Sequence, residues 1–406
     1  MIENLSYLSK AKGTGGEIKK NPWDFIVQEI DVNGEIYAID QKIDSKWTKK
    51  EEFVVFILQK RNWTTQQALR EVTKRLGMGK KRYSCAGSKD RGATTVQLAS
   101  VFGADPDELK KVKIKDIDVL GAWYWDCPIK MGDLLGNKFE IRIPSVEEDA
   151  SRVKSIMDET NGLIPNYFGE QRFGIRDNTH KVGKFILKGN FEEAVKEYIL
   201  GGKDPKRDGE IFKEIKELID NYDFKKALEK FPKHMKYEIT LLSHLSEKGT
   251  DYIGALRKMP RSTLLMFVHA VQSDIFNQVL SQKIKEKKPG EKLEIEEGEY
   301  ECSRNWYDFP EVDRVDGTFP VGKILGYASK PNKREIRVLE EKDIEVEKFK
   351  IKSIPEISSA GSYRPFLVPI KNFKFDYEKN FYGFELPAGS YATVAMREFL
   401  DKNKKN

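Results

Sequence analysis

Two changes of pattern along the chain constrain its fold more than any single motif. Strand-like segments dominate up to about residue 145, for example the apolar run FVVFILQ (53–59), whose length suits a buried strand. Helical patterns follow, including LLMFVHAVQSDIFNQVLSQKI (264–284), and strand-like segments return in FLVPIKNFKFDYE (366–378). A chain of 406 residues also exceeds one ordinary core. These patterns predict two or three domains, the first an α+β domain with a mixed, mostly antiparallel sheet.

Local signals indicate where further helices and strands lie. Behind a threonine cap at Thr64, the residues Ala68, Val72 and Leu76 repeat at helical spacing, which predicts a helix. Further helices are expected at 146–160 and 190–200 and after the LPAGS turn near the C-terminus. Strands are expected at 22–57 around a turn, at 83–86, 94–101, 119–129 and 139–143, and in IRVLE (336–340) and IEVEKFKI (344–351).

The charge balance and the lack of targeting signals narrow the class of protein. The net charge is +6, from 71 basic and 65 acidic residues, which permits an RNA partner without requiring one. No apolar segment is long enough to cross a membrane, and the N-terminus lacks the layout of a signal peptide, so we expect a cytoplasmic protein with no membrane partner. The three cysteines and four histidines are scattered, which supports neither disulfides nor a metal site.

The segment KRYSCAGSKDRGATTVQLASV (81–101) presents a single carboxylate, Asp90, between Lys89 and Arg91. It does so on a turn between two expected strands. Flanking cations keep a carboxylate ionised, as a nucleophile that faces a polyanionic substrate requires. A solvated turn with weak surface ion pairs explains the same triplet. The choice between these interpretations depends on other segments of the chain.

Four other segments combine aromatic, amide and cationic residues. Packing or turn formation explains each segment alone, but together they supply rings that stack on bases, amides that read base edges and cations that hold phosphates. No P-loop, Rossmann fingerprint or metal-ligand cluster accompanies them. The segments are PWDFIVQE (22–29), which follows Lys19 and Lys20, GNKF (136–139), NYFGEQRFG (166–174) and LPAGSYATVAMRE (386–398).

Five motifs in this order resemble those of the TruD family of tRNA pseudouridine synthases. The resemblance spans nearly the whole chain and implies that the protein isomerises uridine to pseudouridine in tRNA. Its departures are small, and they include a tyrosine at position 391, where phenylalanine also occurs in the family. The matching segments are PxDFxVxE (22–29), AGxKDxxAxTxQ (86–97), GNxF (136–139), PNYFGxQRFG (165–174) and LPAGSYAT (386–393).

The resemblance implies roles for individual residues. Asp90 corresponds to the catalytic nucleophile, and Lys19, with Lys20 as the adjacent alternative, corresponds to its cationic partner. The remaining residues line the substrate site. The base pocket falls on Phe25, Asn137, Phe139 and Tyr391, and Arg172 and Arg364 are candidate phosphate contacts.

The resemblance also implies an architecture and a partner. A discontinuous catalytic domain (1–165 and 370–406) would be interrupted by a large α/β insertion, the TRUD domain (166–369), with tRNA bound between the two. An isomerisation has no net redox change or hydrolysis, so no metal or organic cofactor is expected. Family analogy indicates uridine 13 of tRNA as the target. A monomer is expected, although the sequence does not fix the oligomeric state.

The residues alone leave two chemical routes and two other function classes open. Asp90 could attack covalently or could abstract a proton in a glycal route. An RNA-binding or RNA-chaperone protein with this fold would need the aromatic and basic residues but not Asp90. A glycoside or nucleoside hydrolase would pair two carboxylates, and the other motifs offer Asp90 no obvious acidic partner.

Overall fold

The computed structural model describes residues 4–18, 21–44, 49–79, 82–144, 150–203, 209–288 and 291–401. Within these ranges, no helix is long and apolar enough to cross a membrane. The strands are β1 (Phe25–Asp31), β2 (Phe53–Arg61), β3 (Tyr83–Cys85), β4 (Thr94–Phe102), β5 (Ile117–Trp125), β6 (Leu134–Arg142), β7 (Leu163–Pro165), β8 (Tyr300–Arg304), β9 (Pro310–Val315), β10 (Phe319–Ile324), β11 (Ser362–Pro365), β12 (Leu367–Pro369), β13 (Lys371–Asp376) and β14 (Phe381–Pro387).

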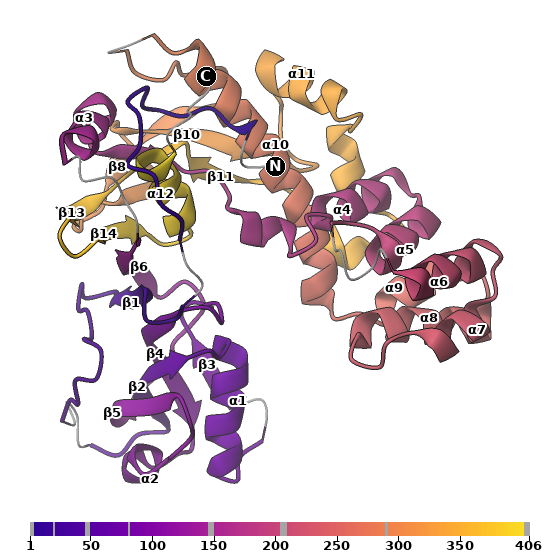
Figure 1. Ribbon diagram of the computed structural model, residues 1–406, viewed down its shortest axis with the longest axis horizontal. Helices are drawn as coiled ribbons and strands as arrows, with labels where there is room; N and C mark the ends of the chain where they lie inside the picture. Colours follow the sequence, from indigo (N-terminus) through magenta and orange to yellow (C-terminus); the bar gives the residue numbers. More distant parts are fainter. Residues whose placement is uncertain are drawn as a thin grey trace.

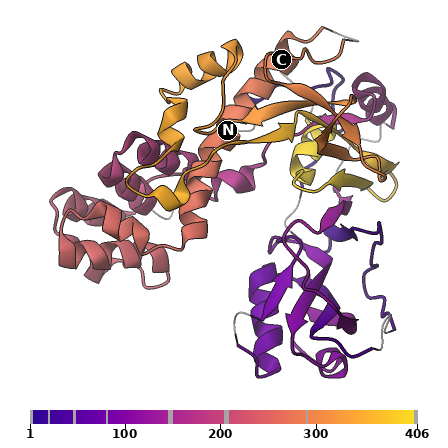
Figure 2. The same cartoon turned by 180° about the vertical axis from the view of Figure 1, so that it is seen from behind.

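Helices surround these strands and also form an arm of their own. Figure 1 shows α4 to α9 together at one end of the molecule, away from the sheet that contains β1 to β6, and Figure 2 shows the same separation from behind. The helices are α1 (Thr65–Arg75), α2 (Pro106–Lys110), α3 (Ala150–Thr160), α4 (Thr179–Lys188), α5 (Phe191–Leu200), α6 (Glu210–Asp220), α7 (Phe224–Lys230), α8 (Lys236–Lys248), α9 (Tyr252–Arg257), α10 (Arg261–Glu286), α11 (Lys333–Glu341) and α12 (Ala392–Leu400).

The largest sheet has eight strands and joins the two ends of the chain. Seven of them follow the order β13-β14-β6-β1-β4-β2-β5, and β3 pairs with β4. The β1–β4 pair is parallel, and the other pairs in this sheet are antiparallel. This architecture confirms the predicted α+β fold with a mixed, mostly antiparallel sheet.

One face of this sheet carries two separate hydrophobic clusters. On the β6–β14 side, Phe139 and Phe384 belong to a cluster that includes residues of α3 and α12. On the β2–β4 side, Phe56 and Ala99 belong to a cluster that includes residues of α1 and α2. The strand register places these residues on the same face, because Val27 pairs with Phe139 on one side and with Thr95 on the other. The middle of this face therefore lies between the two hydrophobic clusters.

A short strand pair connects the large sheet to the rest of the chain. Strand β7 pairs with β12, so the two chain segments on either side of residues 166–366 lie side by side. Between them lie the helical arm, the long helix α10 and a four-stranded sheet of order β11-β10-β8-β9. Much of α10 is buried, including Phe267, Val271 and Phe276, because other elements pack around it.

Most of the predicted elements are confirmed, and two are wrong. The expected strands within 22–57, at 53–59, 83–86, 94–101 and 119–129, and the helix behind Thr64, all form. The strand expected at 139–143 begins earlier, at Leu134. The segment 336–340 lies in helix α11 instead of a strand, and residues 346–349 form a 3₁₀ turn. An asparagine capping box at Asn332 starts α11, and this local signal outweighs the strand-like composition.

We expect Gly183→Ala to destabilise the protein. A β-carbon at Gly183 in α4 would lie 2.1 Å from the Phe267 carbonyl oxygen of α10, so the two helices would have to separate. Alanine is the better helix former by about 1 kcal/mol. The clash outweighs this gain, and we expect a net loss of about 1–3 kcal/mol in the free energy of unfolding. Urea unfolding measures the change. Gly79→Ala is the control, since no described residue other than its chain neighbours has an atom within 4 Å of the added β-carbon. Equal stability of both variants would contradict the prediction.

Candidate active site

A strip of buried polar side chains runs across the middle of the sheet, between the two hydrophobic clusters. It consists of Glu29 on β1, Thr95 and Gln97 on β4, and Lys60 on β2. Lys60, Thr95 and Gln97 are 0% exposed and Glu29 is 3% exposed. Buried polar groups are costly unless they find partners. Most of their partners come from the loop of residues 86–93, which connects β3 to β4 and contains Asp90.

Lys89 fixes the first half of this loop to the sheet. Its Nζ lies 2.7 Å from Oε2 of Glu29, and both side chains are almost fully buried. Its backbone N–H donates to Oγ1 of Thr65, at the start of α1, over 2.9 Å. The Nε2 of Gln97 donates to the carbonyl of Gly87 over 2.8 Å. Lys89, which the sequence places beside the carboxylate, therefore holds the loop in place.

Lys60 fixes the catalytic residue predicted from the sequence. Its Nζ donates to the backbone carbonyl of Asp90 over 2.9 Å. The Asp90 side chain is left exposed, and Thr94 just beyond it donates to the carbonyl of Pro22 over 2.9 Å. Because Ala93 packs in the same cluster as Val27 on β1, and the carbonyl of Asp90 bonds to Lys60 on β2, the loop lies over the face that these strands share.

The charges around Asp90 act in opposite directions. Partial loss of hydration raises the pKa of the Asp90 carboxyl above its usual value, and the positive charges of Lys60 and Lys89 oppose this rise. Burial lowers the pKa of Lys60 to about 8, against the attraction of Asp90. Burial also raises the pKa of Glu29, and its ion pair with Lys89 limits that rise. The ionised form of Asp90 thus depends on two lysines.

Three of the predicted pocket residues lie together on β1 and β6. The rings of Phe25 and Phe139 meet edge to face with their centroids 6.3 Å apart. Phe139 is 6% exposed and also packs against Phe384, whereas Phe25 is only half-buried. Asn137 lies directly opposite Glu29 in the strand register, and its Oδ1 is buried without a hydrogen-bond partner among the described residues. All of them share the face of the sheet that the Asp90 loop crosses.

Tyr391 and Arg172 lie at the junction between the large sheet and the inserted region, the residues 166–366 that the strand pair β7–β12 encloses. Tyr391 immediately precedes α12 and packs against Gly169, where a β-carbon would lie 2.6 Å from its ring. Its ring also meets that of Phe168 edge to face, with the centroids 6.4 Å apart. The guanidinium of Arg172 lies 5.2 Å from the centroid of the Phe168 ring. Strand β14 connects this group to the pocket on β6, because Leu386 pairs with Asn137.

The structure contradicts a phosphate-contact role for Arg364. This side chain is buried, and its guanidinium donates to the carbonyl and to Oδ1 of Asn166 over 3.0 and 2.6 Å and to the carbonyl of Gly389 over 2.9 Å. Burial lowers its pKa to about 10. Arg364 therefore ties the segment that begins at Asn166 to the turn before Tyr391.

The sequence did not reveal Lys60, and Lys19 and Lys20 lie outside the described residues. One signal for Lys60 was present, because a lysine directly after the apolar run 53–59 continues a buried strand. Charged side chains are rarely buried unless they are paired, and such pairs are frequent at functional sites. No group of three or more histidine, cysteine, aspartate or glutamate residues in the described ranges could hold a metal ion.

Comparisons with known proteins agree on one family. The model of the family "tRNA pseudouridine synthase D (TruD)" matches residues 1–399. A protein of Archaeoglobus fulgidus named "Probable tRNA pseudouridine synthase D" is 35% identical over 97% of both chains. A protein of Methanosarcina mazei with the same name is 31% identical, over 98% of this chain and 96% of its own. A crystal structure of a protein of Methanosarcina mazei, described as "Putative tRNA pseudouridine synthase D (TruD)", superposes with a TM-score of 0.73 at 31% identity, over 98% of this chain and 96% of that one.

We expect Glu29→Gln to destabilise the fold, because it leaves the charge of Lys89 buried without a counter-charge. Removal of one partner of a buried ion pair costs about 3–5 kcal/mol in the free energy of unfolding. Urea unfolding of Glu29→Gln, Lys89→Met and the double variant measures the coupling. The double variant should be less destabilised than the sum of the single ones. Additive losses would show that the two charges do not stabilise each other.

Proposed function

The chain belongs to the TruD family of tRNA pseudouridine synthases, and we propose that it converts uridine 13 of tRNA with Asp90 as its catalytic carboxylate. Isomerisation of uridine to pseudouridine in tRNA follows from the family. The observation that best supports Asp90 is its setting. Its carboxylate is exposed, and contacts of the loop with buried Lys60 and Glu29 hold its backbone in place. Partial loss of hydration raises the pKa of this carboxyl, and the positive charges of Lys60 and Lys89 lower it.

The reaction requires a carboxylate that stays ionised and stays in place. The N1–C1′ bond of uridine breaks, the uracil turns, and a C5–C1′ bond forms. C5 then loses its proton and N1 gains one, so that no atom is added or lost. Asp90 would act as the nucleophile or as the base that takes a proton, and both routes use the ionised form. Lys60 and Lys89 favour that form.

We propose that the uracil binds over the face of β1 and β6, beside Asp90. The target base must leave its stack to reach an enzyme side chain. Asn137 is half-buried on this face, and its side-chain amide can pair with the edge of uracil. Phe25 and Tyr391, both half-buried, offer rings to the base, and the more deeply buried Phe139 supports Phe25.

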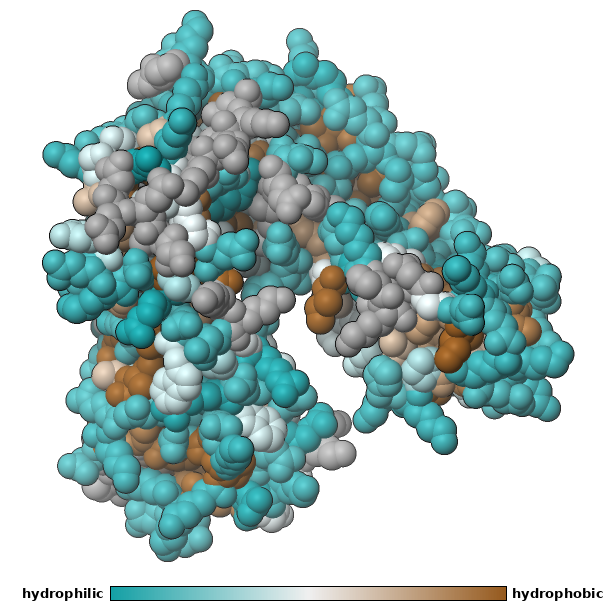
Figure 3. Space-filling view, viewed as in Figure 1, coloured by the Kyte–Doolittle hydropathy of each residue, from teal (hydrophilic) through white to brown (hydrophobic). Residues whose placement is uncertain are grey.

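The proposal extends to the rest of the substrate. Figure 3 shows a wide opening between the lobe that carries β1 to β5 and the helical arm, and most of the coloured surface around it is hydrophilic. We propose that tRNA occupies this opening, between a catalytic domain of residues 1–165 and 370–406 and an insertion of residues 166–369. Arg172 would contact a phosphate at the junction, and Lys19 or Lys20 would add a third cation near Asp90. The protein would act as a monomer without a cofactor.

We expect Asp90→Asn to reduce pseudouridine formation at least about a thousandfold, because the amide cannot serve as a nucleophile or base. Folding and tRNA affinity should change little, since Asp90 contributes its backbone carbonyl, not its side chain, to the bond with Lys60. Mapping of pseudouridine in tRNA after incubation with the purified protein measures both the extent and the position. Asp126→Asn, at an exposed aspartate just after β5, is the control. Conversion by Asp90→Asn at a rate near that of the wild type would exclude Asp90.

We expect Lys60→Met to move the acidic limb of the pH profile of kcat/KM to higher pH. The positive charge of Lys60 lowers the pKa of Asp90, so its removal raises that pKa. The active carboxylate, present above its pKa, would then be lost earlier as the pH falls. Lys74→Met, at an exposed lysine of α1, should leave the limb unchanged. An unshifted limb in Lys60→Met would show that this charge does not govern Asp90.

A further inference from the structure

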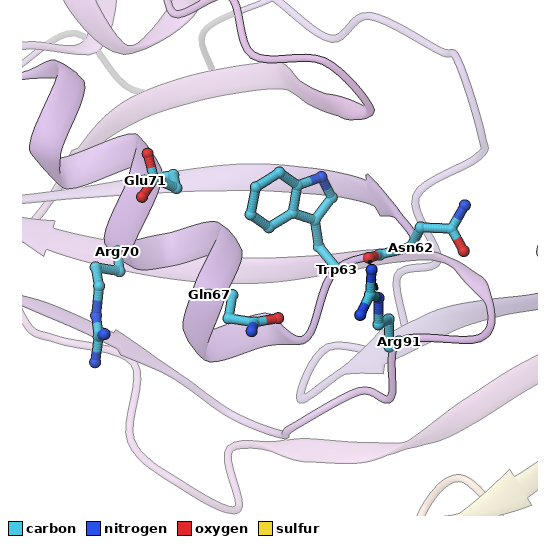
Figure 4. Close-up of a pocket in the computed structure, with 6 residues that line it drawn as sticks. All are labelled: Asn62, Trp63, Gln67, Arg70, Glu71 and Arg91. Atoms are coloured by element: carbon cyan, nitrogen blue, oxygen red, sulfur yellow. Dashed lines mark hydrogen bonds between the residues drawn. The ribbon is translucent and has the colours of Figure 1, made fainter. Parts of the chain in front are cut away.

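A pocket next to the Asp90 loop is not used by the chemistry described above. It has a volume of about 290 Å³ and lies between the first turns of α1 and the loop that carries Arg91. Figure 4 shows the Trp63 indole beside α1, with Gln67 pointing towards that loop. The residues that line the pocket are Asn62, Trp63, Gln67, Arg70, Glu71 and Arg91.

Two chain segments connect the pocket to Asp90. Arg91 directly follows Asp90, so their Cα atoms are about 3.8 Å apart, and its Nε donates to the carbonyl of Asn62 over 2.9 Å. Asn62 in turn comes two residues after Lys60, which holds the Asp90 carbonyl. The pocket therefore lies beside the loop that carries Asp90, as a site for a nucleotide that adjoins the reacting uridine requires.

The lining combines the groups that bind one nucleotide. The Trp63 indole is held in orientation because its Nε1 donates to the carbonyl of Lys115 over 3.2 Å, and its ring offers a stacking surface. Arg70 is exposed and forms no ion pair with any described residue, so its guanidinium is available for a phosphate. Asn62 adds an amide that can pair with a base edge, and the Nε2 of Gln67 adds a donor, since its Oε1 accepts from Thr64 in the N-cap of α1. The volume of about 290 Å³ suits one nucleotide.

We propose that this pocket binds the nucleotide next to the target uridine in the tRNA, with its base on Trp63 and its phosphate at Arg70. The proposal rests on the pseudouridine synthase activity proposed above. When a base leaves its stack, its neighbour loses a stacking partner, which is part of the cost of flipping. Trp63 would replace that partner. The pocket would thus lower the cost of holding the uridine at Asp90.

The test combines protein variants with altered RNA. Trp63→Leu keeps an apolar side chain for packing and removes the stacking ring. It should lower single-turnover kcat/KM roughly 5- to 100-fold, as expected for the loss of one stacked base. A tRNA with an abasic nucleotide directly 5′ or directly 3′ of the target should lower the wild-type value by a similar factor on one of the two sides. On that side, the loss should not grow further in Trp63→Leu, because both changes remove the same contact.

Arg70→Ala tests the phosphate contact separately, at an exposed position where loss of the side chain leaves the core unchanged. Its affinity for tRNA should fall, and the slope of log Kd against log salt should decrease by about 1. Arg75→Ala, which removes the same charge from the last turn of α1 outside the pocket, should keep the wild-type slope. Melting temperatures identify any variant that fails to fold.

Three failures of this test are distinguishable. The pocket does not bind the neighbouring nucleotide if the wild type converts uridine but Trp63→Leu reacts as fast as the wild type and the abasic tRNAs react as fast as the unmodified tRNA. The same holds if the losses from Trp63→Leu and from the abasic nucleotide simply add. An unchanged salt slope in Arg70→Ala refutes the phosphate contact. If the wild type converts no uridine in any tRNA, the proposed function fails, and the pocket proposal fails with it.

Discussion

The candidate active site depends on a strip of polar side chains buried under the Asp90 loop. Lys60, Thr95, Gln97 and Glu29 lie where a sheet of this kind would otherwise carry apolar residues. The hydroxyl of Thr95 is buried without a hydrogen-bond partner among the described residues. The burial of Lys60, Gln97 and Glu29 is tolerable because the loop supplies partners, such as the ion pair of Lys89 with Glu29. The loop is held in turn by the same contacts. Sheet and loop therefore stabilise each other, and the position of the carboxylate follows from the fold.

The parallel pairing of β1 with β4 explains how distant motifs meet at this strip. Strand β1 pairs with the first residues of β4 and β3 pairs with its last ones, so the loop that leads from β3 back to the start of β4 runs alongside β1, where Lys89 meets Glu29. On the other side of β1, the antiparallel strand β6 places Asn137 opposite Glu29, and β14 follows with Leu386 beside Asn137. Segments more than 350 residues apart in the sequence thus reach one face of one sheet.

The sequence predicted which motifs meet on this face better than it predicted the charged groups buried there. The sequence motifs that contain Phe25, Asn137 and Phe139 all reach this face, and Asn137 and Phe139, two residues apart on β6, point to the same side. Lys60 escaped prediction because a lysine after an apolar run looks like a strand end, and only the tertiary register buries it. The segment 336–340 looked like a strand, yet Val338 and Leu339 are both buried while Ile336 is 43% exposed, which fits a helix and not an alternating strand. Such errors arise where long-range packing decides between local alternatives.

Arg364 shows how the inserted region can influence the active site from a distance. Its guanidinium holds Asn166, at the start of the inserted region, and Gly389, in the turn before Tyr391. Ser390 also donates to Oδ1 of Asn166. A buried cation with all these bonds is costly to displace. Any movement of the inserted region relative to the large sheet therefore has to carry Tyr391 along or break these bonds, so the position of the tyrosine is coupled to the position of the insertion.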